Sequence, residues 1–383
     1  MHYKPEYKVY VITGEESGEN IAYEILKKLT NKINIKFYGI GGDKLKRLGL
    51  EPIFSVSELS IMGILEIIPK IPKLINLIYK TYNDILNVEP HLIISVDSPG
   101  FVFRVLQKVK IKKNISTLHI VAPTVWAWKP NRAKKISKYV DNLFVLFPFE
   151  KKYFVPHGIK TTYIGHPFLN NIKNINSTKD LLQIKKKIIS IFPGSRKGEI
   201  DIHLNTILLF LSKNKLFKHY KFIIIAVDRH YDFIKNIAKL YKGLLDISVL
   251  NSSKYKNYAF KYSDYAIAVS GTITLELAIS KVPLIVVYKL NFLSFFILKK
   301  LVKVKYVSLA NIILNKNVIP ELIQYNFSYV KFNKELENLI FNQRYKNRQL
   351  KMFNKLEYIL QKNIKNYGAA IAVNAIIKLL KEN

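Results

Sequence analysis

Residues 9–20 read VYVITGEESGEN, and residues 189–200 read ISIFPGSRKGEI. Each stretch passes from a short, almost entirely apolar run into a turn that contains Gly and Ser, and then into a segment with helical character. A strand buried on both faces, a tight turn and a helix form the opening unit of a doubly wound α/β domain. Because this unit occurs once in each half of the chain, the sequence predicts two such domains.

The rest of the chain continues to alternate short apolar runs with amphipathic stretches, which is typical of strand and helix units in parallel sheets. A polar, Asn-rich stretch after Pro167 lacks periodicity and predicts a linker. We expect an α/β fold with two Rossmann-like doubly wound domains that face one another across a ligand-binding cleft. The predicted domains are residues 1–170 and 171–350, followed by a helical tail at 351–383 that either closes the second domain or returns to the first.

The individual elements follow from the same periodicity. In the first half, strands are predicted at 9–13, 35–40, 92–97, 117–121 and 143–147, and helices at 19–30, 71–86 and 101–112. In the second half, strands are predicted at 188–192, 222–227, 265–269 and 284–287, and helices at 200–211, 231–241 and 273–281.

Composition excludes several classes of protein. Of the 383 residues, 49% are hydrophobic and 23% are charged, which is typical of a globular chain rather than a disordered or low-complexity one. The absence of Cys excludes disulfides, thiolate metal sites and cysteine nucleophiles. The chain starts without the apolar core of a signal peptide, and no apolar run is long enough to span a bilayer, so we expect a cytoplasmic protein.

The charge balance is unusual, because 61 Lys and Arg residues against 27 Asp and Glu residues give a net charge of +34. Such a field attracts phosphates, anionic lipid surfaces or nucleic acid. No helix-turn-helix or aromatic RNA-binding signature is present, so we expect no nucleic-acid partner. Two apolar segments punctuated by lysines, after Ile61 and after Leu284, favour attachment to a membrane surface instead.

In the first half, Asp97 ends an apolar run in LIISVDSPG and is our candidate for a general base, because ligands of such sheets bind at the carboxyl ends of the strands. The alternative is that Asp97 caps the following helix. Glu15 and Ser17 lie in the first Gly-containing turn, which lacks the spacing of a dinucleotide-binding loop. We interpret them as lining a sugar pocket, with a purely structural turn as the alternative.

In the second half, Ser195 and Arg196 follow a strand and suit a diphosphate, with an exposed Arg at a strand end as the alternative. Gly271 and Thr272 form a second turn of this kind, and Glu276 follows within the predicted helix. The Glu276 carboxylate either accepts hydrogen bonds from ribose hydroxyls or caps the helix.

Two further features carry no catalytic assignment. Trp126 and Trp128 lie in APTVWAWKPNR, where core anchoring and contact with sugar or lipid are both open. No metal-ligating spacing and no phosphate loop ending in Gly-Lys-Ser or Gly-Lys-Thr occurs, so no metal or other cofactor is predicted.

The motifs carry a family resemblance that spans about Val9 to Gln324. In order, they are GEESGEN, FYGIGGDKLKRLG, ELSIMGILEIIP, DSPGF, APTVWAWKPNR, FPFEKKYF, YIGHP, PGSRKGEI, SGTITLELA and YVSLANIIL. Together they strongly resemble lipid-A-disaccharide synthase of Gram-negative bacteria. Where that family usually has Asp, this chain has Glu19, and it has Gly100-Phe101-Val102 where the family often has Asp-Phe-Asn.

The resemblance implies an inverting GT-B glycosyltransferase that joins UDP-2,3-diacylglucosamine to 2,3-diacylglucosamine 1-phosphate and releases UDP. It implies Asp97 as the base on the acceptor 6-hydroxyl, Glu15 and Ser17 on the first-domain side of the pocket, and Asn311 facing the cleft near the donor. The UDP would be held by Ser195, Arg196, Gly271, Thr272 and Glu276. The enzyme would work peripherally on the cytoplasmic face of the inner membrane, at the inner-leaflet surface, and a homodimer is compatible with this.

Two alternatives differ from that interpretation. One is another UDP-sugar enzyme of the same fold, such as a UDP-GlcNAc epimerase or a murein-type GlcNAc transferase, against which VWAW and SIMG argue. The other is a basic protein without catalytic activity that coats membrane or nucleic acid, for which only the net charge argues.

Overall fold

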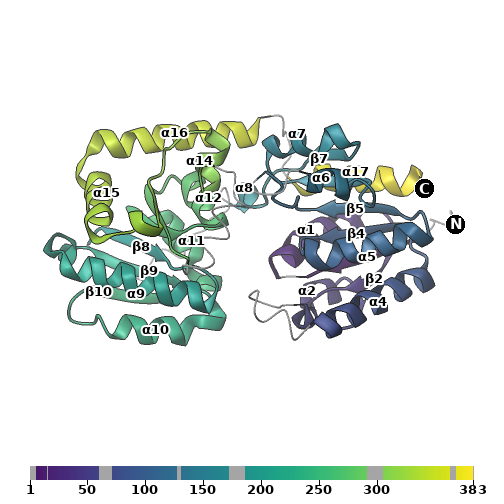
Figure 1. Ribbon diagram of the computed structural model, residues 1–383, viewed down its shortest axis with the longest axis horizontal. Helices are drawn as coiled ribbons and strands as arrows, with labels where there is room; N and C mark the ends of the chain where they lie inside the picture. Colours follow the sequence, from purple (N-terminus) through teal and green to yellow (C-terminus); the bar gives the residue numbers. More distant parts are fainter. Residues whose placement is uncertain are drawn as a thin grey trace. The chain divides into compact units, whose positions relative to one another are not determined.

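The computed structural model describes residues 6–14, 16–59, 71–126, 131–171, 186–290, 305–362 and 368–382 (Figure 1). The chain divides into two compact units. Unit 1 comprises residues 1–170 and 363–383, and unit 2 comprises residues 171–362. Of the range 351–383 that was predicted as a tail, the first part therefore belongs to unit 2 and the last part to unit 1.

Unit 1 is built on a seven-stranded sheet with the order β3-β2-β1-β4-β5-β6-β7, and all its strand pairs are parallel. The strands are β1 (Tyr7–Thr13), β2 (Ile35–Ile40), β3 (Glu51–Pro52), β4 (Leu92–Val96), β5 (Ser116–Ile120), β6 (Asn142–Val145) and β7 (Lys160–Tyr163). The helices are α1 (Glu16–Thr30), α2 (Asp43–Lys46), α4 (Ile71–Val88), α5 (Pro99–Lys112), α6 (Arg132–Ile136), α7 (Lys151–Phe154) and α17 (Ala369–Glu382).

Helices cover both faces of the unit 1 sheet (Figure 1). On one face α4 and α5 pack against each other, and Ile78 and Val105 join Tyr10 and Ile12 of β1 in one core cluster. On the other face α1 packs against β1, β4 and α17. This arrangement follows from right-handed crossovers on either side of β1. The chain thus returns from unit 2 to complete the α1 side of unit 1.

Unit 2 is built on a six-stranded parallel sheet with the order β10-β9-β8-β11-β12-β13. The strands are β8 (Ile188–Phe192), β9 (Lys221–Ala226), β10 (Asp246–Asn251), β11 (Tyr265–Val269), β12 (Leu284–Tyr288) and β13 (Glu321–Ile323). The helices are α9 (Lys197–Lys213), α10 (Tyr231–Lys239), α11 (Ser252–Tyr262), α12 (Thr272–Ile279), α14 (Leu309–Leu314), α15 (Tyr329–Phe341) and α16 (Gln343–Gln361). A short helix, α8 (Phe168–Asn171), lies at the boundary of the units.

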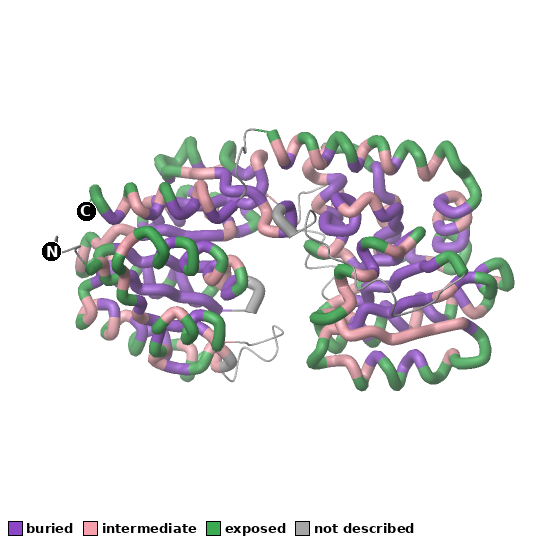
Figure 2. Tube along the Cα trace, turned by 180° about the vertical axis from the view of Figure 1, so that it is seen from behind, coloured by how far each residue is buried: buried purple, intermediate pink, exposed green. Residues whose placement is uncertain are grey.

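The central strands of both sheets are buried along their length, whereas the edge strand β10 is half-buried throughout (Figure 2). This burial explains why the central strands have continuous apolar sequences. The predicted α/β class with two doubly wound domains is confirmed. None of the described helices is long and apolar enough to cross a membrane. The apolar stretches at 61–70 and 291–304 lie outside the described residues.

Candidate active site

In unit 1, two turns meet where the order of the strands reverses. Thr13 at the end of β1 is paired with Val96 at the end of β4, so Gly14 and Asp97 leave the sheet side by side. A Cβ atom at Gly14 would lie 1.9 Å from the Ser98 Oγ, and one at Gly18 would lie 3.4 Å from the Asp97 Cβ. The first turn therefore needs glycine to approach the second so closely. Ligands of doubly wound sheets bind at this kind of position.

Asp97 sits in a backbone conformation that is unfavourable for residues other than glycine. The φ angles are 54° at Asp97, 46° at Ser98 and 74° at Val121, which follows the neighbouring strand β5. Such positions cost on the order of 1–3 kcal/mol each and cluster at active sites. The Asp97 amide donates to the Ile120 carbonyl oxygen over 3.1 Å, which fixes the strained turn to the sheet.

The Asp97 carboxylate is free of the capping role that was the alternative to catalysis. Ser98, not Asp97, is the N-cap residue of α5, and the Phe101 and Val102 amides both donate to the Ser98 carbonyl oxygen over 3.1 Å. Burial raises the pKa of Asp97, and a hydrogen bond from the Ser98 backbone lowers it in part. A raised pKa brings a carboxylate closer to the range in which it accepts a proton effectively.

The other unit 1 candidates are described only in part. Glu15 lies outside the described residues, and Ser17 falls in the first turn of α1 with its side chain not described. Glu19 is buried, and its Oε1 accepts the amides of Lys44 over 2.9 Å and Leu45 over 3.1 Å. Glu19 therefore caps the start of α2, a structural role that the sequence did not indicate.

An apolar pocket of about 570 Å³ opens beside the Asp97 turn. One wall is the start of α5, with Arg104 as the charged residue among those that line the pocket. The other wall is α4, whose Ile71 and Ile75 are 43% and 49% exposed, unusually open for residues of this kind. The lining residues are Leu59, Ile71, Leu74, Ile75, Ile78, Ser98, Gly100, Phe101 and Arg104.

An aromatic cluster joins three of the sequence motifs at the carboxyl ends of β5, β6 and β7. Trp126 meets Phe149 edge to face at 5.5 Å between ring centroids, Phe149 stacks on Phe147 at 5.9 Å, and Phe147 stacks on His166 at 5.9 Å. Trp126 is half-buried and packs against this cluster, while Trp128 lies outside the described residues. Beneath the cluster, Glu150 accepts the Phe147 amide over 3.0 Å, and burial raises its pKa to about 7.

In unit 2, the two phosphate-type turns also meet at the point where the strand order reverses. Phe192 of β8 is paired with Ala268 of β11, so the loops that follow these strands are neighbours. Gly194 has a φ of 106°, and the side chains of Ser195 and Arg196 after it are exposed. The first loop is thus open to a ligand on its side-chain face.

Two charged contacts hold this first loop. Arg196 Nη1 lies 3.1 Å from Glu199 Oε1 one turn further along α9. Arg229 Nη2 donates to the Ser195 carbonyl oxygen over 2.9 Å. Arg229 was not a predicted site residue: like Arg196 it follows a strand, β9, but its loop lacks the Gly and Ser that drew attention to the first loop. It adds a second guanidinium to the loop that ends at Arg196.

The second loop leads into α12, where Gly271 and Thr272 are exposed and Glu276 is buried. Glu276 Oε2 lies 2.5 Å from Lys256 Nζ on α11. Burial raises the pKa of Glu276, and the Lys256 ammonium lowers it in part. Glu276 lies beyond the first turn of α12, so it is not a helix cap. Its carboxylate is positioned by Lys256 below the exposed turn.

The structure corrects the prediction for Asn311. Asn311 is fully buried in α14. Its Nδ2 donates to the Ile319 carbonyl oxygen and to Glu321 Oε1, each over 2.8 Å, and its Oδ1 accepts the Val318 and Ile319 amides, each over 2.9 Å. All four hydrogen-bonding positions of the amide are thereby occupied. Asn311 stabilises the connection to β13 and does not face a ligand.

The chain thus carries two doubly wound parallel sheets, each with its turns gathered where the strand order reverses. Two such domains in one chain characterise the GT-B fold, which solved structures similar to this chain share. UDP-GlcNAc 2-epimerase from Neisseria meningitidis has this fold, with a TM-score of 0.65, 15% identity, and coverage of 98% of this chain and 100% of the other. MurG from Acinetobacter baumannii has a TM-score of 0.58, 13% identity, and coverage of 98% and 100%. At these identities, the likeness shows the fold alone.

The sequence comparisons show the family. Residues 9–375 match the family model described as Lipid-A-disaccharide synthetase. Lipid-A-disaccharide synthase from Rickettsia felis is 38% identical over 396 residues, covering 98% of this chain and 99% of the relative. The enzyme of the same name from Rickettsia prowazekii is 37% identical over 361 residues, covering 93% and 94%. The chain belongs to the lipid-A-disaccharide synthetase family and is a glycosyltransferase, and the resemblance drawn from its motifs is confirmed.

Proposed function

We propose that the chain transfers 2,3-diacylglucosamine from UDP-2,3-diacylglucosamine to 2,3-diacylglucosamine 1-phosphate. The products are the β-1,6-linked lipid A disaccharide 1-phosphate and UDP. In this proposal unit 1 binds the acceptor and unit 2 binds the donor nucleotide. The observation that carries it is the strained, partly buried Asp97 beside an apolar pocket, in a chain that belongs to this family.

The acceptor side combines a base with a place for acyl chains. Asp97 takes the proton from the acceptor 6-hydroxyl as its oxygen attacks the anomeric carbon of the donor. The apolar pocket between α4 and α5 accommodates acyl chain next to that carboxylate, and it lies within reach because Ser98 lines it. Glu15 and Ser17 contribute to the sugar pocket in this proposal.

The donor side stabilises the leaving group. As the new bond forms at the anomeric carbon, the bond to the UDP oxygen breaks and negative charge develops on the diphosphate. Ser195 and Arg196 on one loop, and Gly271 and Thr272 at the start of α12, supply hydrogen bonds and positive charge to it. Glu276, which forms an ion pair with Lys256, accepts hydrogen bonds from the ribose hydroxyls. A single displacement inverts the anomeric centre.

The substrates also set where the enzyme works. Both carry acyl chains, and the acceptor carries a phosphate, so both reside in a membrane. We place the protein peripherally on the cytoplasmic face of the inner membrane, where its net charge of +34 favours anionic lipids. A homodimer is compatible with this placement.

The test of the proposal is UDP release by the purified protein with UDP-2,3-diacylglucosamine, in the presence and absence of the acceptor. Wild type should release UDP only with the acceptor, and Asp97→Asn should reduce the rate by about 10²–10⁴-fold while leaving donor binding unchanged. Asp43→Asn is the matched control, because Asp43 is an exposed carboxylate of α2 in the same unit.

Three results would contradict parts of the proposal. Full activity of Asp97→Asn would remove Asp97 as the base. Turnover of UDP-GlcNAc without acyl chains, at a rate equal to that of the acylated donor, would favour a different UDP-sugar enzyme of this fold. Absence of UDP release by a folded protein under all conditions would reject the reaction.

A further inference from the structure

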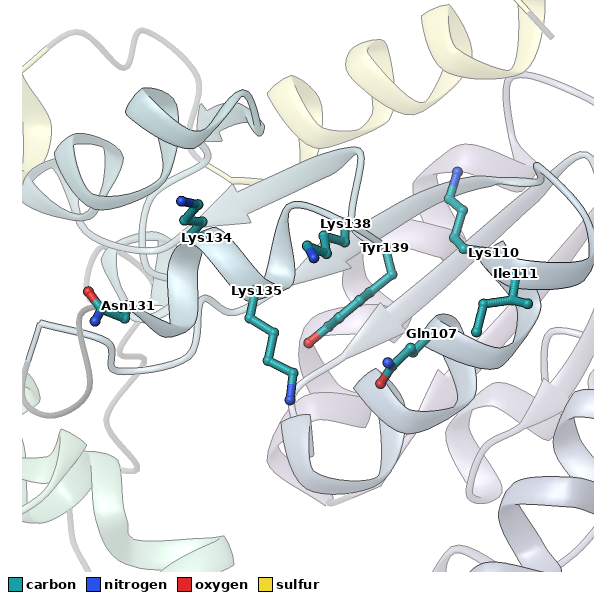
Figure 3. Close-up of a pocket in the computed structure, with 8 residues that line it drawn as sticks. All are labelled: Gln107, Lys110, Ile111, Asn131, Lys134, Lys135, Lys138 and Tyr139. Atoms are coloured by element: carbon teal, nitrogen blue, oxygen red, sulfur yellow. The ribbon is translucent and has the colours of Figure 1, made fainter.

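A hollow of about 490 Å³ on unit 1 has no part in the proposed reaction (Figure 3). It lies between the second half of α5 and the α6 segment, whereas the apolar pocket lies at the start of α5 against α4. We call it the lysine hollow and define it by Lys110 and Ile111 of α5 together with Lys134, Lys135, Lys138 and Tyr139.

The lysine hollow is positively charged, because four lysines and no acidic residue line it. Lys110 is compensated by Asp141 Oδ2 at 2.8 Å. Lys134, Lys135 and Lys138 are exposed, and none of them takes part in an ion pair among the residues that the structure describes. Three uncompensated amines in one hollow favour a ligand with concentrated negative charge.

The floor of the hollow is rigid and able to donate hydrogen bonds. Tyr139 is buried, and its ring packs on Phe103 with 5.6 Å between the centroids. Figure 3 shows the side chains of Lys135, Tyr139 and Gln107 converging from the two sides of the hollow. Amine, hydroxyl and amide groups together suit the oxygens of a phosphate group.

The rim adds an apolar contact. Ile111 is 82% exposed, and on α4, which packs on the same side of the sheet, Ile71, Ile75 and Tyr79 are between 43% and 49% exposed. Exposed apolar side chains beside lysines are typical of surfaces that lie in the head-group region of a membrane. An exposed apolar side chain such as Ile111 contributes to binding of a lipid layer, but not to binding of a free phosphate or of a nucleic-acid backbone.

We propose that the lysine hollow binds the phosphate of an anionic phospholipid head group, with Ile111 entering the layer beneath it. This inference rests on the membrane attachment in the proposed function and assigns it to a surface. It places the side of unit 1 that carries the apolar pocket against the lipid, so the acyl chains of the acceptor need not cross water to reach Asp97.

The experiment measures binding of the full chain to phosphatidylcholine vesicles with and without phosphatidylglycerol. We expect wild type to prefer the anionic vesicles, and the triple variant Lys134→Glu, Lys135→Glu, Lys138→Glu to bind them at least about 100-fold more weakly, since each lysine near an anionic surface contributes about fivefold. Ile111→Ser should also weaken binding without changing the charge. UDP release from detergent-dispersed substrates should stay at the wild-type level in both variants, which also shows that they are folded.

The matched control reverses the same amount of charge elsewhere in unit 1. Lys27, Lys28 and Lys381 are exposed on α1 and α17, which pack on the other side of the sheet. Changing these three to Glu should leave vesicle binding within a few-fold of wild type. An equal loss in the control and in the hollow variant would mean that only diffuse charge matters, and would overturn the proposal.

Other outcomes separate the remaining explanations. If wild type released UDP but did not bind anionic vesicles, membrane attachment would be rejected. The proposed transferase activity would still stand. If inorganic phosphate, added at constant ionic strength, fully displaced the protein from anionic vesicles, the hollow would be assigned to free phosphate. The proposal of a lipid head group would then be overturned. Tighter binding of an RNA oligonucleotide than of vesicles, lost in the hollow variant alone, would also overturn it.

Discussion

Gly14 is the residue at which the candidate site tolerates no side chain. A Cβ there would lie 1.9 Å from Ser98 Oγ and 2.4 Å from Ser98 Cβ, so Gly14→Ala must push the Asp97 turn away from its position. We expect the variant to lose at least tenfold in acceptor-dependent UDP release, because a base displaced by even 1 Å loses much of its effect.

The same contact supplies a rescue. Ser98→Gly removes the atoms that Gly14→Ala would meet and suits the φ of 46° at that position, so the double variant should regain much of the lost activity. Gly49→Ala is the control, because a Cβ there meets nothing within 4 Å, although its φ of 85° adds some strain. Equal loss in the single and double variants would mean that the contact does not position Asp97.

Glu150 gives unit 1 a dependence on pH. Burial raises the pKa of this carboxyl from 4.5 to about 7, so the folded state holds the proton more tightly than the unfolded state. The protonated Glu150 carboxyl therefore makes its full contribution to the free energy of unfolding below about pH 4.5. This contribution is lost as pH rises through 7. Between pH 5 and pH 8, wild type should lose up to about 3 kcal/mol relative to Glu150→Gln.

Tryptophan fluorescence measures this effect selectively, because both tryptophans of the chain, Trp126 and Trp128, belong to unit 1. Unfolding midpoints of wild type and Glu150→Gln are compared at pH 5 and pH 8. Glu24→Gln, at an exposed position of α1, should follow wild type at both values. If the unfolding midpoint of Glu150→Gln changes between pH 5 and pH 8 in parallel with that of wild type, the Glu150 carboxyl is ionised in the folded state throughout this range.

At the scale of elements, a side chain of one helix determines the start of another. Glu19 of α1 accepts the Lys44 and Leu45 amides at the start of α2. Removing such a cap costs about 0.5–2 kcal/mol, so Glu19→Ala should raise hydrogen exchange at these two amides several-fold. Glu19→Asp should fall between wild type and Ala because its carboxylate is shorter by one methylene. Unchanged exchange in Glu19→Ala would show that α2 needs no cap.

The elements that the sequence predicts are those whose burial leaves a continuous pattern. Strands β8 and β11 were predicted because every residue in them is buried, and this burial makes their sequences continuously apolar. Strand β3 has only two residues, and β10 is half-buried at every position, so neither stands out as an apolar run. Edge strands form because their backbone pairs with a neighbouring strand, and this pairing leaves no pattern in the local sequence.

The site divides in the same way. Asp97 and Arg196 were proposed as site residues because Asp97 directly follows strand β4 and Arg196 lies in the turn after strand β8, and the carboxyl ends of parallel strands meet at one edge. Arg229 was missed because the Ser195 carbonyl oxygen that it contacts belongs to another loop. Glu150 was missed although its partner, the Phe147 amide, lies only three residues before it. Asn311 was placed wrongly because its partners, Val318, Ile319 and Glu321, lie beyond the end of its own helix, and its local sequence does not show that the chain turns back to fill its amide.

At the scale of the whole molecule, the chain closes unit 1 with its last helix. Buried residues of α17, including Ala372, Val373 and Ile376, complete the side of unit 1 on which α17 packs against α1. Unit 1 therefore depends on residues that are made after all of unit 2. Ile376→Asp places a charge in this contact and should destabilise unit 1 by several kcal/mol.

The two units allow this dependence to be measured directly. Leu356→Asp is the counterpart, because Leu356 is equally buried but lies on α16 in unit 2. Ile376→Asp should lower the midpoint of unfolding seen by tryptophan fluorescence, which reports unit 1, whereas Leu356→Asp should lower only the midpoint of the unit 2 transition seen by circular dichroism. Lys381→Asp, at an exposed position of α17, should change neither. If Ile376→Asp leaves the fluorescence midpoint unchanged, unit 1 is complete without α17, and the return of the chain serves some purpose other than its stability.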